Sequence, residues 1–148
     1  MITVKIAETK EEIKEAQKIR EEVFIKGQNI SPEIELDGLD KTATHFLLYY
    51  SEAKNKKVEL VGCGRLRVVD GNAKLERVAV LKEFRGKHLG QIITKEMIRY
   101  AKEKGYKEIY MNAQYYLLDY YKKLDFKEVG KSFEEAGIKH IKMVYVGG

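Results

Sequence analysis

Apolar residues in this chain alternate with polar ones in short runs and recur with a helical period in longer stretches. Ile2 to Ala7 alternates and predicts a first strand, and Thr9 with Glu12 has the signature of a capping box before a helix. That helix is predicted to fade near Lys26, where its apolar stripe ends. The stripe consists of Ile13, Ala16, Ile19, Val23 and Phe24.

Three apolar runs in the middle of the chain predict further strands. One of them, Val58 to Val69, is followed by Asp70-Gly71-Asn72, and Asp-Gly favours a tight hairpin turn. Gly62 and Gly64 inside that run indicate a bulge or the close approach of another element. The other two runs are Ala43 to Ser51 and Leu75 to Leu81.

The second half of the chain predicts helices and strands in alternation. Apolar residues at helical spacing predict a helix from Leu89 to Lys104, ended by Gly105. Asn112 is predicted to cap a tyrosine-rich helix from Ala113 to Leu124. The remaining segments are predicted as strands at Lys107 to Met111, Phe126 to Gly130 and Ile138 to Val146, and as a loop at Ser132 to Gly137. This mixture predicts one α+β domain over residues 1–148, with a mixed, mostly antiparallel sheet flanked by helices.

Composition and charge narrow the classes of function. A single cysteine excludes an internal disulfide framework and suits a reducing compartment, so we expect a cytoplasmic protein. No apolar run is long enough to span a bilayer, and we expect no membrane partner. The net charge of +5 comes from scattered lysines, which disfavours nucleic acid but suits a polyanionic small molecule.

The segment KEFRGKHLG, between the strand ending at Leu81 and the helix that follows, has the chemistry of an anion site. A helix N-terminus presents unpaired N–H groups and positive dipole charge, and Gly86 and Gly90 allow close backbone approach. Arg85 and Lys87 add full positive charges. The segment matches neither a P-loop nor a dinucleotide fingerprint, and a plain turn with solvated lysines is the alternative.

The same segment resembles motif A of the GNAT acyltransferase superfamily, Arg/Gln-x-x-Gly-x-Gly/Ala after a V-x-V strand. Arg85 takes the first position and Gly90 the last, whereas His88 replaces the usual first glycine. YYKKLDF, Tyr120 to Phe126, is similar to the superfamily's FYEKLGF, with Asp125 in place of glycine. The combination of REEVF, ELDGLD, AxH and GIKH resembles a bacterial subfamily of small, single-domain members.

The resemblance implies an N-acetyltransferase that moves an acetyl group from acetyl-CoA directly to an amine in a ternary complex, without a metal. The pantetheine arm is expected beside the central strand, and the backbone N–H of Val80 is the expected oxyanion donor. An acyl-CoA-binding module of the same fold without catalysis is the alternative, because of His88 and Asp125. The cofactor-binding residues implied are Val78, Ala79, Val80, Arg85, Gly86, Lys87, His88, Leu89, Gly90, Asn112 and Tyr121.

Catalysis needs an acid for the departing thiolate and a base for the amine. Tyr121 matches the superfamily's acid tyrosine; a role in core packing is its alternative, and Tyr116 and Tyr120 compete for the catalytic role. Glu76 and His140 are the main candidates for the base, directly or through water. Burial would raise the pKa of a glutamate toward the useful range.

The acceptor is expected to be a small-molecule amine or a peptide amine. Gln28 to Thr42 predicts a loop with a short helix, either a solvated connector or a wall whose acids, Glu35 among them, attract an amine. Arg65 and Arg67 share one strand face and, if that face lines the cleft, bind an anionic part of the acceptor. His45 is a further candidate for the acceptor site or the base. The three histidines are too far apart in sequence to suggest a metal site, and a homodimer is common in the superfamily.

Overall fold

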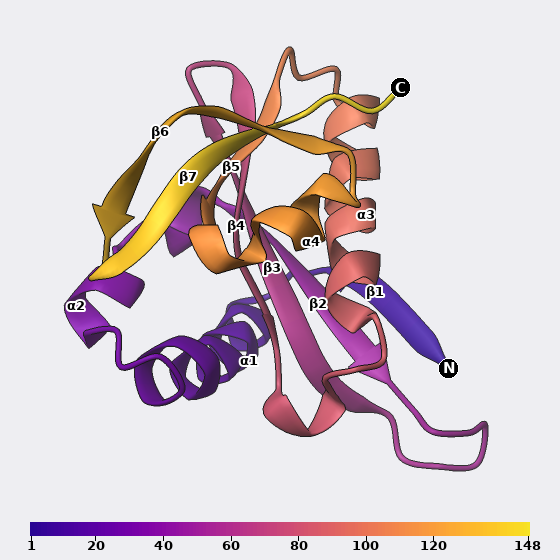
Figure 1. Ribbon diagram of the computed structural model, residues 1–148. Coiled ribbons are helices and arrows are strands. Elements are labelled where there is room, and N and C mark those ends of the chain that lie inside the picture. The colour runs from indigo at the N-terminus through magenta and orange to yellow at the C-terminus, as the bar shows by residue number, and fades with distance from the viewer.

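The computed structural model describes residues 1–148 as a seven-stranded sheet with helices on both faces (Figure 1). The strand order is β1-β2-β3-β4-β5-β7-β6, and β4 with β5 is the parallel pair among antiparallel neighbours. The predicted α+β class is confirmed. The strands are β1 Ile2–Ile6, β2 Thr44–Tyr50, β3 Glu59–Val69, β4 Asn72–Val80, β5 Ile109–Gln114, β6 Phe126–Glu135 and β7 Ile138–Tyr145. The helices are α1 Lys10–Arg20, α2 Pro32–Glu35, α3 Leu89–Glu103 and α4 Leu118–Lys122.

The predicted start of the first helix is confirmed. The Glu12 backbone N–H donates to the Thr9 hydroxyl at 3.1 Å, and the Thr9 N–H donates to the Glu12 carboxylate at 3.2 Å. After Arg20 the helix continues as a π-helical segment, Glu21–Lys26, which the sequence did not predict. No helix in the structure combines the length and apolarity needed to cross a membrane.

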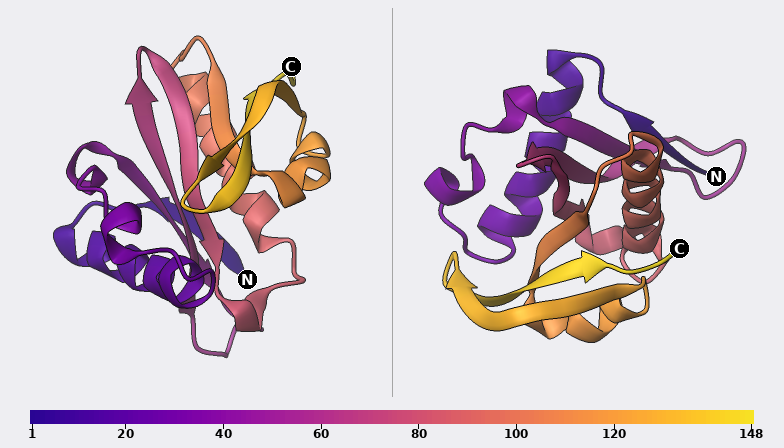
Figure 2. Two further views of the ribbon diagram at one scale, coloured as in Figure 1. Left: turned by 60° about the vertical axis from the view of Figure 1, so that its left-hand side comes forward. Right: turned by 90° about the horizontal axis from the view of Figure 1, so that it is seen from above.

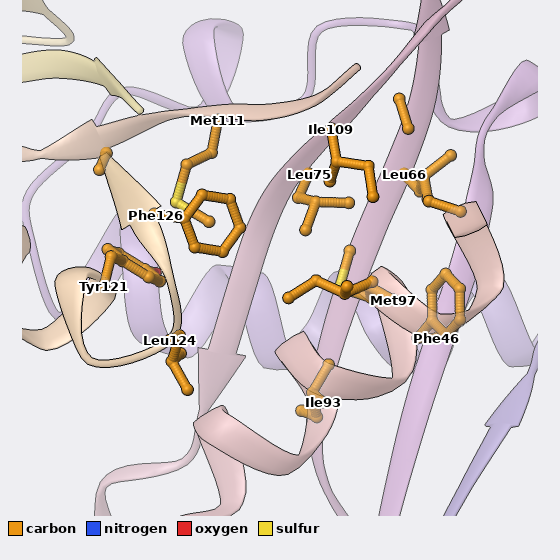
Figure 3. Packing of buried hydrophobic residues seen from close by; sticks show 14 of the residues in the cluster. Phe46, Leu66, Leu75, Ile93, Met97, Ile109, Met111, Tyr121, Leu124 and Phe126 are labelled. Carbon is orange, nitrogen blue, oxygen red and sulfur yellow. The ribbon is translucent and has the colours of Figure 1, made fainter. Parts of the chain in front are cut away.

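Two apolar cores fill the space between the sheet and its helices. The larger lies between the sheet and the pair α3 and α4, where Met97 faces Leu75 and Leu66 of the strands (Figure 3). The smaller lies under α1 and includes Ala16, Ile19 and Cys63. The sheet is therefore packed against apolar residues on both faces.

The glycines of β3 allow α3 to lie close against the sheet. A Cβ atom on Gly62 would come within 2.9 Å of Ile93 Cδ1, and one on Gly64 within 2.6 Å of Met97 Sδ. The ladder also shifts register at this place, so that two β4 residues, Arg77 and Val78, stand opposite Gly64. Both predicted consequences of these glycines, a bulge and a close approach, are therefore confirmed.

The sheet parts between β4 and β5. These strands pair only at Ala73 with Ile109 and at Lys74 with Tyr110, and then diverge. Figure 2 shows β5, β7 and β6 turning away from the first four strands. Arg77, in the bulge of β4, has a left-handed backbone with φ of +56°, and a bulge of this kind bends its strand. We call the unpaired gap beyond Lys74 and Tyr110 the seam.

Two of the predicted elements in the second half are wrong. Asn112 lies within β5 and caps no helix, and the predicted helix from Ala113 is reduced to a 3₁₀ turn, Tyr115–Leu117, and α4. The predicted loop Ser132 to Gly137 belongs largely to β6, whose hairpin turn is Ala136-Gly137 with positive φ at both residues. As an edge strand exposed on both faces, β6 has little apolar alternation, so only its pairing with β7 defines it.

Candidate active site

A cavity of about 710 Å³ follows the seam. Its walls come from β4 and β5, the start of α3, α4, the π-helical segment and the hairpin between β6 and β7. Segments from both halves of the chain therefore meet at one place. The cavity is large enough for a long flexible ligand arm together with a small acceptor.

The backbone of β4 presents free polar groups to this cavity. The Leu81 N–H donates to the Val61 carbonyl of β3 at 2.9 Å, so alternation turns the N–H and C=O groups of Ala79 toward β3 as well. The same alternation turns the groups of Val78 and Val80 toward the seam, where β5 no longer pairs with them. Of the predicted backbone partners, Val78 and Val80 thus face the cavity, whereas the amide of Ala79 faces β3.

The segment Lys82 to Gly90, which we call the basic turn, closes one end of the cavity. Gly86 has φ of +87°, and His88 precedes the first turn of α3 with φ of +61°. His88, and Asp125 with φ of +67° in its own turn, therefore both adopt the left-handed conformation that glycine adopts most readily. The backbone arrangement of both motifs survives these replacements.

Most side chains of the basic turn line the cavity. Arg85, Gly86, His88, Leu89 and Gly90 do so, and Arg85 Nε donates to the carbonyl of Val80 at 3.1 Å. Lys87 points elsewhere, since its ammonium lies 5.7 Å from the centre of the Tyr50 ring. The first N–H groups of α3 are unpaired by helix geometry, so this end of the cavity suits an anion.

Tyr121 lies in the cavity wall between the seam and the larger core. Its ring packs edge-on against Phe126 (Figure 3), at 6.1 Å between ring centres. It also packs edge-on against Tyr120, at 5.0 Å between ring centres. Burial raises the pKa of the Tyr121 phenol, with smaller contributions from Tyr120 and Tyr116. The phenol therefore stays protonated at neutral pH and can donate a proton.

Glu76 lines the cavity but is strongly paired. Its carboxylate accepts a hydrogen bond from Arg67 Nε and lies 3.0 Å from Arg65 and 3.6 Å from Lys74. Burial opposes ionisation, yet the hydrogen bond from Arg67 and the charges of Arg65 and Lys74 hold the pKa of Glu76 below its usual value. The predicted rise in this pKa is wrong, because the cations outweigh burial.

His140 faces the cavity from β7 with a defined tautomer. Nδ1 lies 2.7 Å from the Ile138 carbonyl oxygen, which can only accept, so Nδ1 carries the proton and Nε2 is free to accept one. The Glu135 carboxylate lies 3.6 Å from Nε2, and the ring stacks on Phe133 at 6.0 Å between centres. Glu135 is placed to stabilise a protonated imidazole.

Three acids of the segment Gln28 to Thr42, namely Glu35, Asp37 and Asp40, pair with buried arginines. Arg20 Nε and a terminal nitrogen donate to the Glu35 carboxylate at 2.5 and 3.0 Å, and a second terminal nitrogen donates to Asp40 at 2.7 Å. Arg65 donates to Asp37 and Asp40 at distances of 2.7 to 2.9 Å. These acids fix the segment to the sheet and are not free to attract a cationic amine, contrary to the predicted role of Glu35.

Two predicted acceptor residues lie in this ion-pair network and not in the cavity. Arg65 is fully buried, and its charge is used by Asp37, Asp40 and Glu76. His45 is buried, its Nε2 donates to the Asp40 carbonyl at 2.9 Å, and burial lowers its pKa. Of the predicted acceptor residues, Arg67 and Glu35 line the cavity, and His45 and Arg65 do not.

The structure adds cavity residues that the sequence analysis missed. Gln28 and Gln114 exchange two side-chain amide hydrogen bonds, of 2.8 and 3.3 Å, from opposite walls. Arg77 donates to Asp37 at 3.3 Å, and Lys74 lies opposite Arg67 in the ladder. Lys74 could have been found by counting the register outward from the Asp70-Gly71 turn, whereas the glutamine pair, 86 residues apart, gives no sequence signal.

The mixed sheet parts between two parallel strands, beside a turn suited to an anion and a buried tyrosine. This arrangement is that of the acyltransferase class that the sequence resembles. The profile described as "Acetyltransferase (GNAT) domain" matches residues 6–146. The chain therefore belongs to the GNAT acetyltransferase family and is an acetyltransferase.

A relative from Bacillus subtilis agrees with this assignment, and solved structures share the fold. The chain is 39% identical to the uncharacterised N-acetyltransferase YjcF of Bacillus subtilis over 94% of this chain and 96% of the relative. Its fold matches an acyl-CoA N-acyltransferase from Pseudomonas aeruginosa with a TM-score of 0.84, at 24% identity over 99% and 100% of the two chains. It also matches a GNAT acetyltransferase from Elizabethkingia anophelis with acetyl-CoA bound, with a TM-score of 0.61, at 21% identity over 97% and 94% of the chains.

Proposed function

We propose that this protein transfers an acetyl group from acetyl-CoA directly to the amine of an acceptor, with both substrates bound at once. The observation that carries the proposal is the seam. It offers the backbone of Val78 and the N–H of Val80, which β5 does not pair, along a cavity that ends at the basic turn; the Val80 carbonyl accepts from Arg85. An amide-containing pantetheine arm fits such a strand edge, and a diphosphate fits the unpaired N–H groups of α3.

Fit of the cosubstrate is supported by groups at both ends of the seam. Gly90 leaves room at the start of α3, where a Cβ atom would come within 3.0 Å of the Tyr120 hydroxyl. Arg85 and the helix dipole balance negative charge at this end. Tyr121 lines the same cavity as Val80, and we assign the thioester at the other end of the pantetheine arm to the space between them.

The chemistry follows from three groups around that thioester. The amine nitrogen bonds to the carbonyl carbon, and the developing oxyanion accepts a hydrogen bond from the N–H of Val80. The carbon–sulfur bond then breaks, and the Tyr121 phenol gives its proton to the departing thiolate. The products are the acetylated amine and free coenzyme A thiol.

His140 is the base that this arrangement favours. Its Nε2 is the unprotonated nitrogen, and Glu135 lies beside it to stabilise the charge gained. Glu76 is held ionised by cations and is a weak acceptor of protons, so we assign it the role of placing Arg67 and Lys74. His140 releases the proton taken from the amine to solvent through the open mouth of the cavity, and a proton from solvent restores the Tyr121 phenol before the next turnover.

Transfer without an acyl-enzyme is supported by the state of the lone cysteine. Cys63 is buried under α1, outside the cavity, and burial raises the pKa of its thiol to about 12. A buried, protonated thiol is a poor nucleophile. We expect Cys63→Ala to retain acetyl transfer within about twofold, because the position is buried but not catalytic.

The proposal is tested by measuring acetyl-CoA binding and thiol release separately. Titration calorimetry with acetyl-CoA tests the seam, and thiol release from acetyl-CoA with a panel of primary amines tests transfer. We expect binding in the micromolar range typical of such cosubstrates and amine-dependent thiol release. Binding without release for any amine would favour an acyl-CoA-binding module, and absence of binding would refute the assignment of the seam.

A further inference from the structure

The cavity wall at the β3–β4 side, away from the basic turn, is also basic. Arg67 on β3 and Lys74 on β4 stand opposite each other in the ladder, and both line the cavity. Their side chains are 21% and 16% exposed, so each remains accessible to a ligand. We call these two residues the cationic pair.

The cationic pair has donors that the protein does not use. Arg67 bonds to Glu76 through Nε, which leaves both terminal nitrogens of its guanidinium for a ligand. The Lys74 ammonium lies 3.6 Å from the same carboxylate, too far for a hydrogen bond. Since Arg65 also contacts Glu76, three cations share this carboxylate and the wall keeps positive charge.

Other carboxylates near this wall do not neutralise the excess. Glu35 is paired with Arg20, and Asp37 is paired with Arg65 and Arg77. The most exposed carboxylate of the cavity is Glu135, which is 47% exposed and lies next to His140, whereas Asp37, 25% exposed, is held by its two arginines. The cavity thus has Glu135 and His140 at one wall and the unused cationic donors of Arg67 and Lys74 at another.

The cationic pair is too distant from the basic turn to serve the cosubstrate's diphosphate. Lys74 and Val80 are separated by roughly 20 Å along β4 at the usual rise of a strand. Arg85 and the start of α3 lie beyond Val80 in the chain and at the other end of the cavity. A second anion, belonging to the other substrate, is the remaining ligand for these donors.

We propose that the acceptor is an amine that also carries an anionic group, a carboxylate or a phosphate, bound by Arg67 and Lys74. This inference rests on the proposed function and specifies its acceptor. The amine then faces His140 and Glu135 while the anion pairs with the guanidinium fork of Arg67. Glu76 orients that fork, and the nearby positive charge also favours the neutral, nucleophilic form of the amine.

Matched acceptors test the proposal without any mutation. Because Lys74 and Val80 are roughly 20 Å apart along β4, thiol release from acetyl-CoA is measured with unbranched amino acids of increasing length, from glycine to 6-aminohexanoate, against their amides. Amines that carry a phosphate at the far end of an equally long chain are measured against the corresponding alcohols. We expect kcat/KM to be at least about tenfold higher for the anionic member of a pair, as a charge-assisted hydrogen bond gives. The two series distinguish a carboxylate from a phosphate as the preferred anion.

Variants of the cationic pair locate the effect. Arg67→Met and Lys74→Met are each expected to remove the preference by raising KM for the anionic acceptor, with KM for acetyl-CoA unchanged. Lys74→Arg is expected to retain the preference. Lys142→Gln is the control, because Lys142 pairs with Glu108 outside the cavity. This variant is expected to leave kcat/KM unchanged for both the anionic and the neutral acceptor.

The outcomes separate the two claims. Equal or better turnover of the neutral amines by the unmodified protein would overturn the cationic pair as an acceptor site and leave the acetyltransferase reading intact. A preference that persists in both Met variants would also overturn it. If acetyl-CoA binds but thiol release with every acceptor equals the rate without amine, both the proposed function and this inference are overturned.

Discussion

Removal of the Tyr121 hydroxyl is the most direct test of the proposed chemistry. The ring makes its contacts with Tyr120 and Phe126 through carbon, so Tyr121→Phe keeps the packing of the wall. The side chain is buried, and loss of a buried hydroxyl leaves folding stability equal or slightly higher where that hydroxyl lacks a protein partner. Effects on turnover can therefore be assigned to the missing proton.

The size of the effect follows from the role of the proton. A positioned general acid contributes about 10²- to 10⁴-fold, which is about 3 to 5 kcal/mol of transition-state stabilisation. Tyr121→Phe is expected to lower kcat by at least about 10²-fold, with acetyl-CoA affinity little changed. Because burial raises the pKa of Tyr121, the unmodified enzyme is expected to show no loss of rate from this phenol at mildly alkaline pH.

The assay compares thiol release and calorimetric acetyl-CoA affinity for Tyr121→Phe and Tyr120→Phe. The Tyr120 hydroxyl lies by Gly90, near the basic turn, so its removal is expected to affect cosubstrate KM more than kcat. An acetyl donor with a more acidic thiol needs less protonation and is expected to reduce the defect of Tyr121→Phe. Equal kcat for Tyr121→Phe and the unmodified enzyme would remove Tyr121 from the mechanism.

Three further predictions concern the basic turn and the ion-pair network. Gly90→Glu is expected to abolish acetyl-CoA binding in calorimetry, because a carboxylate enters the diphosphate site; unchanged affinity would show that the turn is only structural. Arg20→Met leaves Glu35 and Asp40 without their main partner and is expected to cost about 3 to 5 kcal/mol in urea unfolding; a loss below about 1 kcal/mol would contradict a stabilising network. Burial opposes ionisation of Asp40, but hydrogen bonds from Arg20 and Gln17 lower its pKa from 3.8 to about 2. Because the folded-state pKa is lowered, ionised Asp40 contributes about 2 kcal/mol to the free energy of unfolding above pH 4, and this contribution is lost toward pH 2. The urea midpoint of Asp40→Asn is therefore expected to fall less between pH 4 and pH 2 than that of the unmodified protein.

Local signals in the sequence predicted the parts of the fold that local interactions determine. The capping box at Thr9, the hairpin at Asp70-Gly71 and the turn into α3 each depend on a few neighbouring residues, and each is present. The extent of β6 and the end of β5 depend on pairing with β7, which is set by residues distant in sequence. The π-helical segment Glu21–Lys26 has no sequence signal that we recognise.

The candidate site was predictable where it follows a motif and not where it depends on long-range pairing. The predicted cofactor-binding residues Arg85 to Gly90 and Tyr121 come from contiguous motifs, and all of these but Lys87 line the cavity. Arg65 and Arg67 were correctly placed on one face of β3, but α2 and the loop after it cover Arg65 and leave Arg67 open. The sequence of β3 alone does not indicate which carboxylates pair with Arg65 and Arg67.

The parted sheet has a consequence for folding stability and for motion. With ladder pairing limited to two positions, β5, β7 and β6 are attached to the rest of the sheet by few backbone bonds. Under the proposed function, acetyl-CoA bound in the seam pairs with the open edge of β4 and acts as a removable strand that joins the two halves. Amide hydrogen exchange in β5 is therefore expected to slow when acetyl-CoA is present, and unfolding to become harder by about 2.7 kcal/mol at a hundredfold excess over Kd.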